Sequence, residues 1–152
     1  MSRRVSTLFL VSALLVLGVP ALADHHITAW DQDAIAHNLD RLVKSASNIR
    51  MGLVRGASDE EKDPERETPS VREVVFRDLS EIQRRAVALQ GLVRGGQSYE
   101  ATLPLYRHLR SDIANAAADA EDFPEIQKQQ SHIDAAQKAI DSLDAYYGYG
   151  TP

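Results

Sequence analysis

Three consecutive residues near the start of the chain, Asp24, His25 and His26, form its most specific chemical pattern. They become the N-terminus if a signal peptide is removed after Ala23. The free α-amine, two backbone amides and the imidazole of His26 would then place four nitrogens in a square-planar set, which suits Cu(II) or Ni(II). The ring of His25 could add a ligand or compete for one. We therefore expect the processed chain to bind one Cu(II) ion at Asp24, His25 and His26.

The other histidines and the paired acids give weaker chemical signals. His37, His108 and His132 fall beside the apolar stripes described below, so we expect them at exposed or rim positions, away from any buried metal or haem. The acidic run at 59–61 lies in a polar stretch, where burial does not separate carboxyl pKa values for acid–base catalysis. The sequence has no G-x-S-x-G, H-E-x-x-H, glycine-rich phosphate loop or EF-hand spacing. We expect no enzymatic activity.

The first 23 residues have the pattern of a secretory signal peptide. Arg3 and Arg4 precede an apolar run from Leu8 to Val19, and Ala21 and Ala23 form an A-x-A cleavage site. The apolar run is shorter than the roughly 20 residues that cross a bilayer. We expect cleavage after Ala23 and export of one domain, residues 24–152, to the periplasm or the cell exterior.

Composition restricts the classes of partner and cofactor. The chain has no cysteine, which excludes disulfides, thiolate metal sites and thioether attachment of haem. Its net charge of −5 becomes −7 when the two arginines of the signal peptide are removed. Nucleic acid is a poor partner for a chain this acidic. No second apolar span follows the first, so we expect no membrane association after cleavage.

Four apolar stripes predict four helices, because apolar residues recur at steps of three and four. The stripe of the first helix is Ile35, Leu39, Leu42, Ala46, Ile49 and Leu53. That of the second is Val75, Leu79, Ile82, Ala86, Leu89 and Val93. The third is Leu103, Tyr106, Leu109, Ile113, Ala116 and Ala120. The fourth is Ile126, Ile133, Ala136, Ile140, Leu143 and Tyr147.

Capping residues and prolines predict where these helices begin. Thr28 or Asp31 caps the first, which should run to about Val54. Ser70 and Glu73 have the spacing of a capping box at the start of the second.

The last two helices begin near prolines. Pro104 is awkward inside a helix, so the third helix should begin near Thr102, with Tyr99 in a preceding turn. The fourth should open at 123–125, with proline in its first turn. Because the connections around the third helix are short, neighbouring helices should be antiparallel. The expected fold is an all-α, up-down-up-down antiparallel four-helix bundle that follows a cleaved signal peptide.

Three polar or aromatic features leave alternatives open. The acidic loop 56–69 between the first two helices is long for a bundle, and a charged connector is favoured over a functional loop. Five arginines of the second and third helices either grip an anionic partner or belong to a mixed, solvated surface, which their acidic neighbours favour; they are Arg84, Arg85, Arg94, Arg107 and Arg110. Tyr146, Tyr147 and Tyr149 either contact a partner or fold over the end of the bundle.

Two segments, Met51–Gly56 at the end of the first helix and Asp144–Tyr146 at the end of the last, occur in a chain with a signal peptide and four heptad helices. This combination resembles the exported four-helix-bundle cytochromes of the c-prime and soluble b types. The resemblance implies the same fold and a haem site. The chain lacks the Cys-x-x-Cys-His motif of the c-prime type, with 140–144 at that place. Where the soluble b type has methionine and histidine ligands, this chain has Gln32 and Tyr147, and tyrosine is a haem ligand in some proteins.

The sequence favours a soluble periplasmic binding or accessory protein that acts through its surface on an unidentified protein partner, without a cofactor. One alternative is a metal or haem protein, with Cu(II) at Asp24, His25 and His26 or with a cytochrome-like role in electron transfer. A second is a periplasmic stress chaperone or adaptor, which needs an exposed apolar cradle that the sequence does not clearly contain. Monomer and dimer are equally compatible with the sequence.

Overall fold

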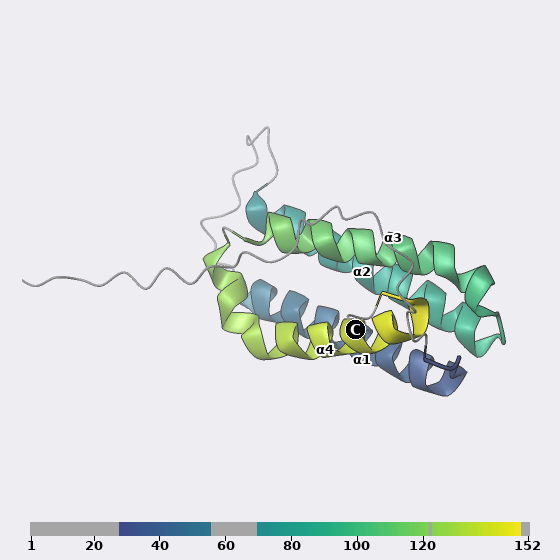
Figure 1. The fold of residues 1–152 in the computed structure, drawn as a ribbon. Helices are drawn as coiled ribbons and strands as arrows, with labels where there is room; N and C mark the ends of the chain where they lie inside the picture. Colours follow the sequence, from purple (N-terminus) through teal and green to yellow (C-terminus); the bar gives the residue numbers. More distant parts are fainter. Residues whose placement is uncertain (1–27, 56–69, 122, 150–152) are drawn as a thin grey trace, which may run out of the picture.

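The computed structural model describes residues 28–55, 70–121 and 123–149, and every regular element in these ranges is a helix (Figure 1). The elements are α1 (Gln32–Arg55), α2 (Val71–Arg94), α3 (Tyr99–Asp119), a 3-10 helix η2 (Pro124–Gln129) and α4 (Gln130–Tyr147). The all-α prediction is confirmed. The expected signal peptide 1–23 and the acidic loop 56–69 lie outside the described residues. Among the described helices, none combines the length and hydrophobicity needed to cross a bilayer.

The first two helices begin at the predicted capping residues. The backbone N–H of Ala34 donates to Oδ1 of Asp31 at 3.0 Å, so Asp31 caps α1 and Thr28 does not. At the start of α2 the N–H of Glu73 donates to Oγ of Ser70 at 3.2 Å. The N–H of Ser70 donates to Oε2 of Glu73 at 2.7 Å, which completes the predicted capping box.

The predicted start of the third helix near Thr102 is wrong, because α3 begins at Tyr99 and contains Pro104. Local hydrogen bonds of Thr102 hold the first turn. Its backbone N–H donates to the carbonyl of Ser98 at 3.2 Å, and its hydroxyl lies 3.0 Å from that carbonyl and 3.1 Å from the carbonyl of Tyr99. Thr102 is also fully buried. These contacts outweigh the single backbone hydrogen bond that Pro104 cannot make.

The fourth helical segment begins at the predicted proline but differs in its winding. Residues 124–129 form the 3-10 helix η2, and the α-helix begins only at Gln130. The N–H of Ile126 donates to the carbonyl of Phe123, three residues earlier, as this tighter helix requires. Phe123 is buried against the core and anchors the start of the segment.

The four helices lie as two layers, α1 beside α4 and α2 beside α3 (Figure 1). α1 also packs along α2, whereas α3 and α4 touch only slightly. The guanidinium of Arg72 donates to the carbonyl of Leu53 at 2.6 Å, which places the start of α2 beside the end of α1. The side-chain amide of Gln90 donates to the carbonyl of Ala36 at 2.9 Å near the opposite ends of the same two helices.

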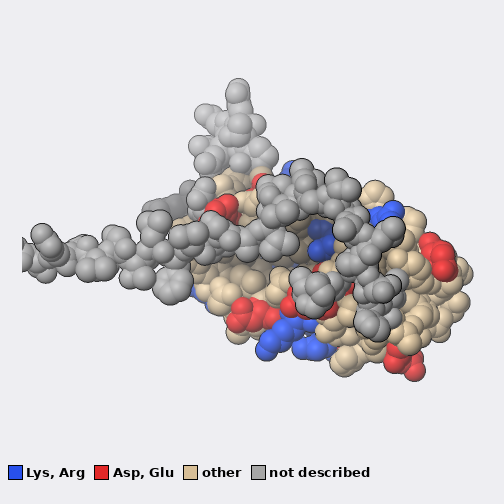
Figure 2. All heavy atoms as spheres, viewed as in Figure 1, with Lys and Arg blue, Asp and Glu red and all other residues tan. Residues whose placement is uncertain are grey.

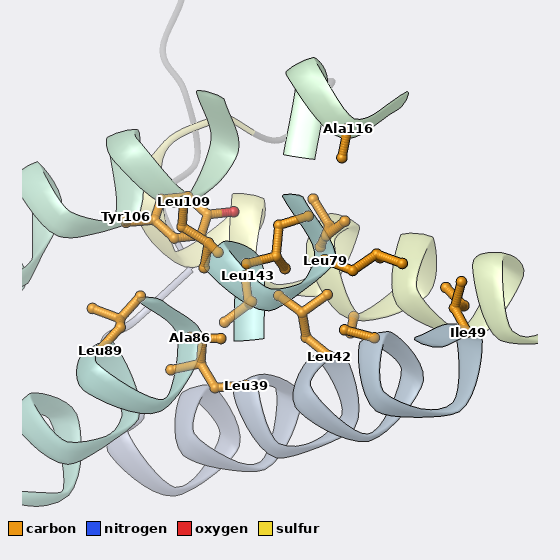
Figure 3. Packing of buried hydrophobic residues seen from close by; sticks show 14 of the residues in the cluster. Leu39, Leu42, Ile49, Leu79, Ala86, Leu89, Tyr106, Leu109, Ala116 and Leu143 are labelled. Carbon is orange, nitrogen blue, oxygen red and sulfur yellow. The ribbon is translucent and has the colours of Figure 1, made fainter. Parts of the chain in front are cut away.

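The predicted stripes of α1 and α2 are confirmed, because none of their members is more than 7% exposed. Their side chains meet in one buried cluster, which includes Leu39 and Leu42 of α1 and Leu79 of α2 (Figure 3). The stripes of the other two helices are only partly buried. Their partly exposed members are Leu103, Ile113, Ala120, Ile126, Ile133 and Ala136. Most of these residues face a hollow between α3 and α4.

Candidate functional site

The hollow between α3 and α4 is an apolar cleft with a cavity of about 160 Å³. Its floor is formed by the stripes of α1 and α2, through Leu42, Ala46, Ile49, Val75, Leu79 and Ile82. α3 supplies one wall, through Ile113, Ala116, Ala117 and Ala120. η2 and α4 supply the other, through Ile126, Ile133, Ala136, Gln137 and Ile140. Among the described residues that line the cleft, only Gln137 has a polar side chain, so this lining offers almost no hydrogen-bonding partner to a ligand.

Small residues on α3 explain why the cleft stays open. The second half of this helix reads Ala-Asn-Ala-Ala-Ala-Asp-Ala from 114 to 120, so the side chains that face α4 are single methyl groups. Ala116 points from α3 toward the side chains of α1 and α2 (Figure 3). A methyl group leaves a gap that a leucine or isoleucine would fill, and the neighbouring atoms lose their packing partners.

At the other end of the bundle, long side chains join α3 to α4. The hydroxyl of Tyr106 donates to Oδ1 of Asp144 at 2.5 Å. Nε of Arg110 lies 3.1 Å from the same oxygen. The hydroxyl of Tyr147 donates to Oγ1 of Thr102 at 3.1 Å. We call these five residues the tyrosine clamp. The clamp joins α3 to α4 at one end of the bundle, and the cleft lies at the other, alanine-rich end.

Aromatic ring contacts add to the hydrogen bonds of the tyrosine clamp. The rings of Tyr106 and Tyr147 stack with their centres 4.0 Å apart, and Trp30 meets the Tyr147 ring edge-on at 5.4 Å. Burial raises the pKa of Asp144, while the hydrogen bond from Tyr106 and the charge of Arg110 lower it. Burial and the neighbouring carboxylate also raise the pKa of Tyr106. None of the five clamp residues lines the cleft, so the clamp positions the walls and does not touch a ligand there.

The structure supports one of the two alternatives for the tyrosines near the end of the chain, in which they pack against the bundle. Tyr147 is 2% exposed, and Tyr149 accepts a hydrogen bond from Nε of Arg107 at 3.2 Å. Arg110 lies over the Tyr149 ring at 4.4 Å from its centre. The described part of this segment therefore folds over the end of the bundle.

Three of the five arginines singled out on the second and third helices lie beside acidic side chains, which supports the predicted mixed surface. Arg84 pairs with Glu81, Arg85 pairs with Asp112, and Arg110 lies beside the buried Asp144. On the face drawn in Figure 2, acidic and basic side chains form small separate groups among uncharged ones. The part of this face that grey atoms leave visible therefore shows no continuous basic surface for a polyanion.

The predicted chemical residues lie apart from the cleft or outside the described ranges. Asp24, His25 and His26 lie outside those ranges, so copper binding stays a prediction. His37 and His108 are exposed and His132 is partly exposed, as expected. In the described segments, no group of three histidine, aspartate or glutamate side chains is placed to hold a metal ion.

The cleft does not fit the haem that the cytochrome resemblance implies. The part of its lining that the structure describes contains no histidine, methionine or tyrosine, so it offers none of the usual axial ligands. Gln32 is exposed, and the hydroxyl of Tyr147 is already bonded to Thr102 within a stack of rings.

Comparisons of the chain with models of known protein families, with curated proteins and with solved structures found no match. The cleft must therefore be interpreted from its own chemistry.

A partly buried carboxyl group, that of Asp78 on α2, lies beside Asp119 of α3 and should make stability depend on pH. Burial raises the pKa of Asp78, and a hydrogen bond with the Asp119 carboxyl raises it further, whereas Arg77 lowers it. The folded state thus holds this proton more tightly than the unfolded state. The free energy of unfolding should therefore fall as pH rises through the range in which Asp78 of the folded protein loses its proton.

Replacing Asp78 by asparagine should stabilise the protein at pH 7, by about 1 kcal/mol, because an amide donates to Asp119 without a charge. The stability gained by the substitution should be smaller at a pH below the usual pKa of aspartate, because Asp78 of the wild-type protein is protonated there. Urea denaturation of both proteins at pH 7 and pH 3 measures the difference. A gain of equal size at both pH values would contradict a titrating Asp78.

Proposed function

We propose that residues 24–152 form an exported, non-enzymatic binding protein that holds an apolar group in the cleft between α3 and α4. The observation that carries this proposal is the lining of the cleft, which is aliphatic on its floor and on both walls. Unfilled apolar volume of this kind weakens a fold, so a ligand that fills it gains packing contacts that the protein alone lacks.

The volume and lining of the cleft indicate the class of ligand. An enclosed apolar cavity of about 150 Å³ accepts benzene or xenon. The cleft has a similar volume of about 160 Å³ and is partly open to solvent, so a ligand can enter it from one side. The described lining residues carry no charge, which favours an uncharged hydrocarbon group, such as an aromatic ring or a short alkyl chain. A cavity of this size suits one such group better than an unfolded client, which favours a small-ligand binding protein over a chaperone.

The proposal includes export of the chain and an antiparallel, up-down-up-down order of its helices. The signal-peptide pattern of residues 1–23 supports export, and the lack of cysteine is compatible with it. The bonds of Arg72 to Leu53 and of Tyr147 to Thr102 join the beginnings of helices to the ends of their neighbours. These pairings support the up-down-up-down antiparallel order.

Methyl NMR of isoleucine-labelled protein tests the proposed site, with toluene as the probe. Six isoleucines line the cleft: Ile49, Ile82, Ile113, Ile126, Ile133 and Ile140. Ile35 is fully buried elsewhere in the core and serves as an internal control. Saturable shifts of the lining methyl groups with little change at Ile35 would support the proposal. Shifts of all isoleucines alike, or of none, would overturn it.

A further inference from the structure

A second surface, on the outer side of α1 and α2, combines exposed apolar side chains with arginines. Met51 and Val54 on α1 are 48% and 59% exposed. Two adjoining hollows share Val54 and Phe76 as lining residues. None of these three residues lines the cleft between α3 and α4, so this surface is independent of the proposed ligand site.

Arginines flank this apolar surface on both helices. Arg50 and Arg55 line the first hollow, and Arg77 lines the second. The guanidinium carbon of Arg50 lies 4.4 Å from the centre of the Phe76 ring, so charge and apolar surface are in direct contact. We call Met51, Val54 and Phe76, together with these three arginines, the arginine-flanked patch.

Within the described ranges, few acidic side chains pair with the arginines of the patch. Arg55 is exposed and makes no ion pair with another described residue. Arg77 is largely exposed and pairs only with Asp78, its own neighbour in sequence, at 3.3 Å. Glu73 also lines the second hollow, but its carboxylate accepts the capping hydrogen bond from Ser70. Counting only the described residues, the patch is therefore cationic, in a chain whose net charge is −5.

We propose that the arginine-flanked patch binds a short acidic peptide segment of a partner protein, with one apolar side chain seated among Met51, Val54 and Phe76. Guanidinium groups pair with carboxylates through two parallel hydrogen bonds, which gives both attraction and orientation. Apolar anchors surrounded by complementary charge are typical of specific protein interfaces.

Charge disfavours the other occupants of this surface. In a two-fold dimer through this patch, Arg55 and Arg77 would face the same cationic side chains of a second copy. An anionic bilayer is a large surface and would be repelled by the net negative charge of the whole chain. A short acidic segment bound at the patch interacts mainly with charges within about one Debye length, roughly 8 Å at physiological salt. The arginines of the patch therefore act on it more strongly than distant acidic residues do.

Fluorescence anisotropy tests this proposal, using a labelled synthetic peptide with a central phenylalanine between runs of glutamate. Saturable binding is expected, and the double substitution Arg55→Glu with Arg77→Glu should weaken it at least about tenfold. Arg41→Glu with Arg94→Glu is the matched control, because these exposed arginines lie on the same two helices, outside both hollows. Equal weakening by the control pair would show non-specific attraction and overturn the proposal.

The apolar part of the patch needs its own variants. Val54→Ser should weaken binding of the peptide severalfold, whereas Val87→Ser, at a valine that is 50% exposed on α2, should not. Circular dichroism checks that each variant is folded. Binding to phosphatidylglycerol vesicles in place of the peptide would identify a lipid surface and overturn the proposal. Peptide binding that appears only after the acids of residues 56–69 are neutralised would identify the chain's own segment as the occupant, and would also overturn it.

Discussion

Replacing Ala116 by leucine should abolish toluene binding and should stabilise the ligand-free protein by about 1 kcal/mol. Ala116 is 8% exposed and lies on the wall of the cleft, so the added carbons enter the cavity of about 160 Å³. Each buried methylene contributes about 0.8 kcal/mol before the loss of side-chain freedom is subtracted. Urea denaturation measures the stability, and the isoleucine methyl spectrum measures binding.

Ala118→Leu is the matched control for this substitution. Ala118 lies two residues further along α3, is exposed and does not line the cleft. The control should change stability by less than about 0.5 kcal/mol and leave toluene binding intact. If Ala116→Leu instead destabilised the protein and still bound toluene, the cavity would not have the shape described.

Removal of the Tyr106 side chain should cause the largest loss of stability among the substitutions considered. Tyr106→Ala should cost about 3–5 kcal/mol, because a buried aromatic side chain is deleted. Tyr106→Phe should cost about 1–2 kcal/mol, because Asp144 then keeps only Arg110 as a side-chain partner. Thermal denaturation measures both.

Tyr99→Phe is the matched control for the hydroxyl group. Tyr99 also stacks on Tyr147, but its hydroxyl makes no hydrogen bond within the described segments. Its loss should change stability by less than about 0.5 kcal/mol. Equal effects of Tyr99→Phe and Tyr106→Phe would contradict the role assigned to the Tyr106–Asp144 bond.

The sequence predicts the first two helices well because their signals agree with one another. Their apolar residues are large, their spacing is regular, and their starts carry side chains that bond to the backbone, such as Asp31 and Ser70. Burial of one continuous stripe on each helix follows directly from this pattern.

The sequence only weakly indicates the tyrosine clamp, through the spacing of its polar residues relative to the apolar stripes. Asp144 lies four residues after Ile140 and three before Tyr147, so it occupies the buried side of α4. Thr102 lies four residues before Tyr106 in the same way. Polar residues at stripe positions indicate a buried network when partners are available, but the partners here lie on another helix, about 40 residues away in the chain.

The cleft could not be predicted from the stripes. The sequence pattern treats alanine and isoleucine alike as apolar, and it predicts that Ala116, Ala120 and Ile133 are buried. Whether they meet a neighbouring helix depends on how far α3 lies from α4. Long clamp side chains bridge the two helices at one end, and methyl groups of alanine line the cleft between them at the other.

The most direct test of the proposed ligand site is a crystal structure determined under xenon pressure, because xenon reports accessible apolar volume without forming hydrogen bonds. The cleft described here predicts xenon density between α3 and α4, in contact with Leu79, Ala116 and Ile133. Ordered water in that space, or side chains of α3 and α4 packed together with no xenon between them, would contradict the account.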